Sequence, residues 1–250
     1  PTSTKQNSAF LHVANYYFKI GKYSYGAKWY SKINPKSIGR YNLEEFNFKY
    51  AYSLFVNKSY IKSKKLFFNL FTSQEYGAQA KYYYGYIAYE QNDYSTAEKY
   101  LSSVETNENF KTKVSYYLAD MNFKLGKFQK AIDNGLPLLA KAKGLELSEI
   151  SKIIGESYFN LQQFKKAIPY LKNYKGKRGK WTNTDYYLLG YAYYKQNDYE
   201  NAINTFNKII SGNNEVAQNA YYHLAECYLQ LNKKTEALNA FKNAAHLNFN

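Results

Sequence analysis

A small side chain recurs along the chain at nearly constant spacing, and this repeat limits the possible folds more than any other feature. The small residues are Ala14, Ala51, Gly85, Ala119, Gly155, Gly190 and Ala225. They are separated by 37, 34, 34, 36, 35 and 35 residues. Self-similarity with a period of roughly 20 to 50 residues is typical of repeat arrays, in which each unit contacts only its neighbours.

A second set of small residues lies twelve positions after the first, flanked by bulky side chains. This set is Gly26, Ser63, Ala97, Ala131, Ala167, Ala202 and Ala237. Three residues before it a ring occurs in six copies, as Tyr23, Tyr60, Tyr94, Phe128, Phe164 and Tyr199. About four residues after it a bulky residue occurs in six copies, as Tyr30, Phe67, Leu101, Tyr170, Phe206 and Phe241. The pattern predicts a helical hairpin in each copy, with helices in contact at the small residues and rings wedged against the neighbouring hairpin.

Short polar turns separate the two helices of a hairpin. They are visible as Gly21-Lys22, Asn92-Asp93, Gly126-Lys127, Asn197-Asp198 and Asn232-Lys233. Glycine and asparagine tolerate the left-handed backbone conformation that ends a helix, so these positions predict the turn of each hairpin.

Two segments carry a resemblance to a known family. Residues 187–193 read Tyr-Leu-Leu-Gly-Tyr-Ala-Tyr and residues 197–202 read Asn-Asp-Tyr-Glu-Asn-Ala, while residues 222–228 read Tyr-His-Leu-Ala-Glu-Cys-Tyr. This pattern resembles the tetratricopeptide repeat. The resemblance implies an all-α fold, a right-handed superhelical solenoid of about seven helix-turn-helix hairpins. We expect a single array over residues 1–250, with repeats near 7–43, 44–77, 78–111, 112–147, 148–182, 183–217 and 218–250, and it is open whether the array is a fragment of a longer protein.

Two departures from the family pattern are visible. The Trp of the family's first helix is absent from every copy. In copy four the second helix contains Gly135 and Pro137. Because proline lacks an amide donor and crowds the preceding turn, we expect this helix to be bent or interrupted there.

Composition narrows the function classes. The formal net charge is +15, from 34 basic and 19 acidic residues, yet Arg40 and Arg178 are the only arginines. The abundance of Lys, Asn, Tyr, Phe and Ile is typical of a gene with low G+C content. Proteins that read nucleic acid depend on arginine for bidentate contacts, so the composition disfavours nucleic acid as a partner.

Catalytic and metal-binding motifs are absent from the sequence. There is no phosphate-binding glycine loop and no nucleophile elbow, so we do not expect an enzyme or a cofactor. The three histidines, His12, His223 and His246, are far apart in the repeat register, which argues against a metal site. The single cysteine, Cys227, excludes an internal disulfide.

A binding surface is implied by the resemblance, since the first helices of such arrays line a concave groove that receives a peptide or a partner helix. The corresponding aromatic positions are Phe48, Tyr52, Tyr82, Tyr86, Tyr89, Tyr116, Phe123, Tyr187, Tyr191, Tyr194 and Tyr222. Copy five interrupts them with Lys152 and Glu156. Tyrosine is enriched in protein interfaces. The alternative is that these rings pack between adjacent first helices, and both interpretations stay open at this point.

The strongest charge feature is the loop that joins copies five and six. Residues 172–181 carry the cations Lys172, Lys175, Lys177, Arg178 and Lys180, followed by Trp181. Such a loop could hold phosphate, a lipid headgroup or an acidic partner. The alternative is a solvated linker with Trp181 placed against the next helix.

The sequence therefore predicts a non-enzymatic scaffold that binds protein partners in a tyrosine-lined groove. The alternative is an electrostatic binder of polyanions, nucleic acid or an anionic membrane surface, through the basic loop. In style the chain is similar to envelope-associated arrays of bacteria such as the Bacteroidota, which suggests a periplasmic or outer-membrane-associated complex.

Overall fold

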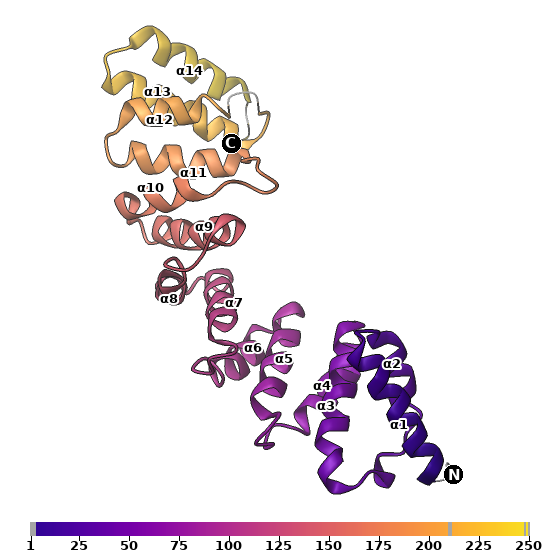
Figure 1. Cartoon of the computed structure of the whole chain (residues 1–250). Helices are drawn as coiled ribbons and strands as arrows, with labels where there is room; N and C mark the ends of the chain where they lie inside the picture. The colour runs from indigo at the N-terminus through magenta and orange to yellow at the C-terminus, as the bar shows by residue number, and fades with distance from the viewer. Residues whose placement is uncertain (1–3, 210–211, 248, 250) are drawn as a thin grey trace. The chain divides into compact units, whose positions relative to one another are not determined.

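The computed structural model describes residues 4–209, 212–247 and 249, and over these residues the chain is helical, with fourteen α-helices and two short 3-10 helices (Figure 1). It divides into two compact units, Pro1–Leu118 and Ala119–Asn250, with the boundary inside α7. The predicted all-helical array of hairpins is confirmed. The repeat boundaries stay a prediction.

The first unit contains three helical hairpins, each made of a longer first helix and a shorter second helix. These are α1 (Thr4–Lys19) with α2 (Tyr23–Tyr30), α3 (Arg40–Val56) with α4 (Tyr60–Phe68), and α5 (Gly77–Glu90) with α6 (Tyr94–Ser102). A 3-10 helix, η1 (Pro35–Ser37), lies between the first two hairpins. Helix α2 also packs on α3, and α4 on α5, so consecutive hairpins are in contact.

The second unit continues the same plan after α7 (Lys111–Lys124). Its elements are α8 (Phe128–Gly135), η2 (Leu136–Leu138), α9 (Gly144–Asn160), α10 (Phe164–Asn173), α11 (Asn183–Tyr194), α12 (Tyr199–Phe206), α13 (Glu215–Gln230) and α14 (Lys234–Leu247). Each of these α-helices packs on the next one along the chain from α8 to α14. The predicted ring before each second small residue opens the second helix, as at Phe164 and Tyr199.

The turn inside every hairpin has one residue in the left-handed conformation. These residues are Gly21, Lys58, Asn92, Gly126, Gln162, Asn197 and Asn232, with φ between 57° and 72°. Copies two and five carry Lys58 and Gln162 where the sequence offers no glycine or asparagine. The packing of the two helices therefore imposes the turn, and it outweighs the unfavourable energy of a left-handed backbone at lysine or glutamine.

The small residues of the first helices receive bulky side chains from the second helices. A Cβ atom at Gly190 would lie 2.7 Å from the ring of Phe206, and one at Gly85 would lie 3.0 Å from the side chain of Leu101. In copy five the residue that fills this position is Leu171, against Gly155. The assignment of Tyr170 to this column was wrong, because the ring of Tyr170 stacks on Tyr158 instead.

Copy four is interrupted as expected. Helix α8 ends at Gly135, and η2 follows with Pro137 inside it. Gly135 is buried, and a Cβ atom there would lie 2.9 Å from the side chain of Ile154 in α9. A proline that cannot donate an amide hydrogen bond thus lies where the α-helix gives way to a tighter turn.

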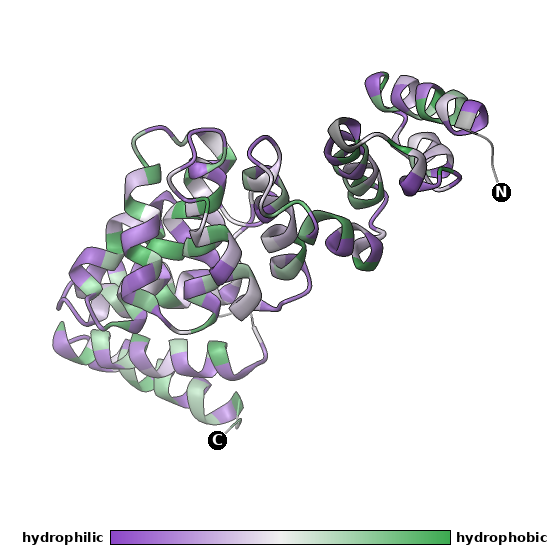
Figure 2. Cartoon of the chain, turned by 90° about the horizontal axis from the view of Figure 1, so that it is seen from below, coloured by the Kyte–Doolittle hydropathy of each residue, from purple (hydrophilic) through white to green (hydrophobic). Residues whose placement is uncertain are grey.

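Hydrophobic and hydrophilic residues are interspersed along the helices (Figure 2), and the second helices α8, α10 and α12 are the most clearly two-faced. Fully buried core residues include Tyr30, Phe67, Ile154 and Phe206. Within the described part of the chain, no helix combines the length and apolar character of a membrane span.

Candidate functional site

The first unit contains an N-terminal aromatic cluster, which consists of Phe48, Tyr52, Phe55, Tyr83, Tyr86, Tyr89 and Tyr117. Tyr83 of α5 lies at the centre of its first half. Its ring centroid is 5.0 Å from that of Phe55, 5.3 Å from that of Tyr52 and 6.4 Å from that of Phe48. The three α3 rings are half-buried, so each leaves part of its surface accessible while its position is fixed by Tyr83.

Tyr117 of α7 has the same role in the second half of this cluster. Its ring centroid is 5.2 Å from that of Tyr86 and 5.0 Å from that of Tyr89. Burial, followed by the charge of Tyr117 and Glu90, raises the pKa of Tyr86 well above its ordinary value. The hydroxyl groups are already engaged within the protein, that of Tyr86 with Glu90 and that of Tyr117 with Tyr82 and Tyr86, so this half of the cluster offers a partner its ring faces.

Tyr82 does not belong to the accessible surface. Only 6% of its side chain is exposed, and its ring stacks on Phe110 with centroids 4.5 Å apart. The sequence-based expectation that Tyr82 lines the surface like Tyr86 is corrected, because the segment before α7 covers its ring.

The second unit contains a C-terminal aromatic cluster, which consists of Tyr187, Tyr191, Tyr194, Tyr222 and His223. The imidazole of His223 lies 6.1, 5.0 and 5.2 Å from the ring centroids of Tyr187, Tyr191 and Tyr194. Its Nδ1 atom is 2.8 Å from a carboxylate oxygen of Glu226. Tyr222, on the same helix, is 48% exposed.

Burial dominates the electrostatics of the C-terminal aromatic cluster. It raises the pKa of Tyr187 to about 12 and, with the Glu226 carboxylate, that of Tyr194 to about 12. Burial lowers the pKa of His223, against the opposing effect of its hydrogen bond to Glu226. A neutral imidazole is therefore favoured among the tyrosine rings.

Both clusters follow one rule that the sequence reasoning missed. In three copies the residue two positions before the first-helix small residue inserts between the inward-facing rings of the preceding hairpin. Tyr83, Tyr117 and His223 occupy this position, and Lys49 extends over the ring of Phe18 at 5.7 Å in the same way. The signal was available as one more column of the repeat alignment, filled by Lys49, Tyr83, Tyr117, Ile153, Leu188 and His223.

Two predicted positions lie outside these clusters. Tyr116 is half-buried, with its ring edge-on to Tyr117 at 5.7 Å. Phe123 is half-buried in the second unit, 6.0 Å from the ring of Phe128 across its own hairpin turn.

The polar interruption of copy five is a charged cluster that fixes the following loop. The Nζ atom of Lys152 is 3.6 Å from a carboxylate oxygen of Glu156, 3.7 Å from one of Asp185 and 4.7 Å from the ring centroid of Tyr174. Burial raises the pKa of Glu156, against the attraction of Lys152. Asp185 also completes a capping box with Thr182 at the start of α11.

The basic loop is compact and held at both ends. The amide of Lys175 donates a 2.9 Å hydrogen bond to Ser148 Oγ, and the indole nitrogen of Trp181 donates a 2.8 Å hydrogen bond to the carbonyl of Tyr174. Arg178 and Gly179 form a left-handed turn between Lys177 and Lys180. Lys172, Lys175, Lys177, Arg178 and Lys180 are all exposed. Trp181 packs on Tyr186 of the next helix, as one of the two sequence interpretations held.

Nothing in the described ranges resembles a metal centre, since no three His, Cys, Asp or Glu side chains come together there. Burial raises the pKa of the single cysteine, Cys227, to about 12, which disfavours the reactive thiolate form. The chemistry that the described side chains offer is therefore aromatic contact, hydrogen bonding and cationic attraction.

Comparisons with known proteins agree with the fold. The family model of anaphase-promoting complex, cyclosome, subunit 3, a repeat family of tetratricopeptide type, matches residues 176–244. No curated protein sequence matches the chain significantly.

Solved structures of MamA, also a tetratricopeptide-repeat protein, share the architecture. MamA of strain AMB-1 has a TM-score of 0.59 at 22% identity, covering 70% of this chain and 93% of that one. MamA of strain MSR-1 has a TM-score of 0.57 at 21% identity, covering 69% and 97%. MamA 41-end of Desulfovibrio magneticus RS-1 has a TM-score of 0.53 at 19% identity, covering 68% and 94%. The resemblance to tetratricopeptide repeats is thus confirmed for the fold, which is one used by protein-interaction scaffolds.

Proposed function

We propose that this protein is a non-enzymatic scaffold that binds a partner peptide or helix on a tyrosine-lined groove formed by its first helices. The observation that supports the proposal most is the way the rings are held. The inward rings of one hairpin are fixed by a side chain of the next, yet remain half-exposed, as Tyr52 and Phe55 are around Tyr83. A surface fixed in advance loses little side-chain entropy when it binds.

The chemistry of these rings suits a protein partner. Tyrosine combines a flat apolar face with a hydroxyl group and few rotatable bonds, which is why it is common among the residues that dominate binding energy. The hydroxyl groups of Tyr86 and Tyr194 already bond to Glu90 and Glu226, so these residues present mainly their ring faces to a partner. An apolar side chain of the partner would lie on the rings.

The experiment is affinity capture of partners from the lysate of the source organism, followed by binding measurements on the purified pair. The variant is Tyr194→Ala with Tyr222→Ala. The matched control is Tyr16→Ala with Tyr25→Ala, because these two tyrosines are 60% and 56% exposed and belong to neither cluster. We expect about a tenfold or greater loss of affinity in the first variant and no loss in the control, with little dependence on salt.

Equal binding by both double variants, together with unchanged binding by Tyr86→Ala, would contradict the proposal. Circular dichroism and denaturant unfolding of each variant exclude a loss of fold as the cause. If the Tyr86→Ala variant alone removed binding, the site would lie on the N-terminal aromatic cluster rather than the C-terminal one.

A second candidate function is the binding of a polyanion through the basic loop. The supporting observation is that, among the described residues, none of the five loop cations has a carboxylate within ion-pair distance. Binding of this kind releases counterions and weakens steeply as salt is added. Loss of binding in a Lys177→Gln, Arg178→Gln variant, together with a steep salt dependence, would favour this candidate over the groove.

A further inference from the structure

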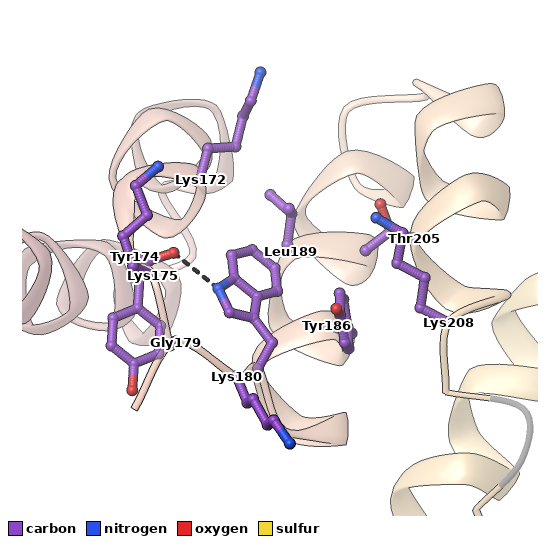
Figure 3. A pocket seen from close by; sticks show the side chains of 10 residues that line it. Lys172, Tyr174, Lys175, Gly179, Lys180, Tyr186, Leu189, Thr205 and Lys208 are labelled. Carbon is purple, nitrogen blue, oxygen red and sulfur yellow. Dashed lines mark hydrogen bonds between the residues drawn. The ribbon is translucent and has the colours of Figure 1, made fainter. Parts of the chain in front are cut away.

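A pocket of about 660 Å³ lies between the basic loop and the hairpin of α11 and α12 (Figure 3). It lies apart from the aromatic clusters and uses none of their residues. Its lining includes Lys172, Lys180, Trp181, Tyr186, Leu189 and Lys208. The loop cations found in the sequence thus face a second element, α12 and the residues after it, which the sequence did not connect with them.

The floor of the pocket is apolar. Trp181 packs on Tyr186 with ring centroids 5.0 Å apart, and Leu189 of α11 belongs to the same core. The indole nitrogen is already bonded to the carbonyl oxygen of Tyr174, as the dashed line in Figure 3 marks. Likewise the hydroxyl group of Thr205 donates to the carbonyl of Asn201 at 2.7 Å. The floor therefore offers a ligand apolar contact area, while the hydrogen-bond donors of Trp181 and Thr205 are already in use.

The rim of the pocket is cationic and lacks compensating charge. Lys172, Lys175, Lys180 and Lys208 line it, and no Asp or Glu does. Throughout the described ranges, none of these four ammonium groups has a carboxylate within ion-pair distance. Lys208 instead lies over the ring of Tyr186, 5.4 Å from its centroid. Uncompensated like charges around one hollow favour an anionic ligand.

The positions of the lysines indicate an extended ligand. In Figure 3 Lys172 and Lys180 point to opposite sides of the pocket, and Lys208 lies beside Thr205 at its third edge. A ligand that satisfies them carries negative charge on both sides of an apolar group. An acidic peptide with a central aromatic side chain has this arrangement, whereas a sugar-phosphate or sulfated polymer has no apolar group to place between its charges.

The pocket is also fixed in advance. The Tyr174 end of the loop is held by Ser148 and the Thr182 end by the capping box with Asp185. Gly176 is buried at φ +81°, where a Cβ atom would lie 2.3 Å from the carbonyl oxygen of Lys180. The loop is thus anchored at both ends and tightly closed, so the backbone that carries the lysines is held in place.

We propose that this pocket binds an acidic peptide segment, with an aromatic side chain of the peptide on Trp181 and carboxylates on both sides of it against Lys172, Lys180 and Lys208. The site would give the scaffold a second contact that is selective for negatively charged partners. Because it shares no residue with the tyrosine groove, either proposal can fail while the other holds.

The test uses the full chain and a fluorescent nine-residue peptide of glutamates with one central phenylalanine, measured by anisotropy. The variant Lys172→Gln with Lys208→Gln removes two rim charges. The control Lys141→Gln with Lys233→Gln removes the same net charge from two exposed lysines outside the pocket. We expect the first variant to weaken binding about tenfold and the control less than about twofold.

Three further probes decide the chemistry. A peptide with alanine in place of phenylalanine is expected to bind about fivefold more weakly, and a lysine-phenylalanine peptide is expected not to bind. Trp181→Leu is expected to weaken the phenylalanine peptide more than the alanine peptide.

The proposal is overturned if the wild-type chain does not bind the glutamate-phenylalanine peptide, or if the alanine peptide binds equally well. It is also overturned if heparin binds more tightly than the peptide at physiological salt, since the site would then serve a polyanion. A result in which both double variants weaken binding equally would assign the effect to net charge and reject the pocket.

Discussion

Gly190 of α11 faces the ring of Phe206 of α12 so closely that the ring fills the space of a side chain. A Cβ atom at Gly190 would lie 2.7 Å from Cε1 of Phe206, which is a fully buried residue. The close packing of these two helices therefore requires that position 190 carry no Cβ atom. Because the same kind of contact recurs at Gly155 with Leu171, the small residues of the repeat set the distance between its two helices.

Gly190→Ala is expected to destabilise the protein by about 1 to 3 kcal/mol, since overpacking against a buried ring outweighs the better helix propensity of alanine. Gly26→Ala is the control. There a Cβ atom would meet its nearest neighbour, Ser53 Oγ, at an ordinary 3.4 Å, so stability is expected to rise by about 1 kcal/mol. Urea unfolding measures both. The double variant Gly190→Ala with Phe206→Leu should lose less unfolding free energy than the sum of the two single losses, because leucine has no ring to clash with the new methyl group. Additive losses would argue against a direct clash.

Lys58→Gly and Gln162→Gly are each expected to stabilise the protein by up to about 1 kcal/mol. Both residues have left-handed backbones, with φ of 58° and 57°, a conformation that costs a residue with a Cβ atom about 1 to 2 kcal/mol. Lys62→Gly, at an exposed position in the first turn of α4, serves as the opposite control and is expected to cost up to about 1 kcal/mol. Denaturation midpoints provide the measurement. A loss of stability at position 58 equal to that at position 62 would show that the turn does not strain Lys58.

Gly176→Ala is expected to open the basic loop, because its Cβ atom would lie 2.3 Å from the carbonyl of Lys180. Gly179→Ala, with a similar φ of +77° but open space around the position, is expected to cost only about 1 kcal/mol and to keep the loop closed. The NMR resonance of the Trp181 indole N–H indicates whether the loop is closed, since this group donates a hydrogen bond to the carbonyl of Tyr174. An unchanged resonance in Gly176→Ala would contradict the assigned closure.

The stability of the protein is expected to fall as the pH drops through the titration of His223. Burial lowers the pKa of His223 in the folded state, so the unfolded chain binds the proton more tightly. The stabilisation associated with the neutral imidazole of His223 is fully present above the unfolded-state pKa of about 6.5. It is lost as the pH falls through the folded-state pKa. In His223→Gln, the difference between unfolding free energies at pH 7.5 and pH 5.5 should shrink. An unchanged difference would assign the pH dependence to other groups.

The helices and their turns could be predicted from the sequence, because small residues, opening rings and polar turns each have a direct physical cause. Gly21 and Asn92 marked their turns correctly, and Gly135 with Pro137 marked the interruption of α8. The turns at Lys58 and Gln162 carried no such mark. There the packing of the two helices imposes the conformation, so the type of residue at the turn does not indicate it.

The candidate surfaces were harder to predict, because exposure depends on segments far along the chain. Tyr82 and Tyr86 occupy equivalent faces of α5, yet Phe110 covers only Tyr82. His223 was judged only as a metal ligand, and its place among three tyrosines of the preceding hairpin was missed. Lys208 lies 28 residues beyond Lys180 in the chain, so the pocket that they share was not visible in the sequence.

The seven left-handed turns give every hairpin of this chain the same connection between its two helices. Each turn has the same backbone conformation whether it is built with glycine, asparagine, lysine or glutamine. A hairpin can therefore change its turn residue by single substitutions while its helices keep their pairing.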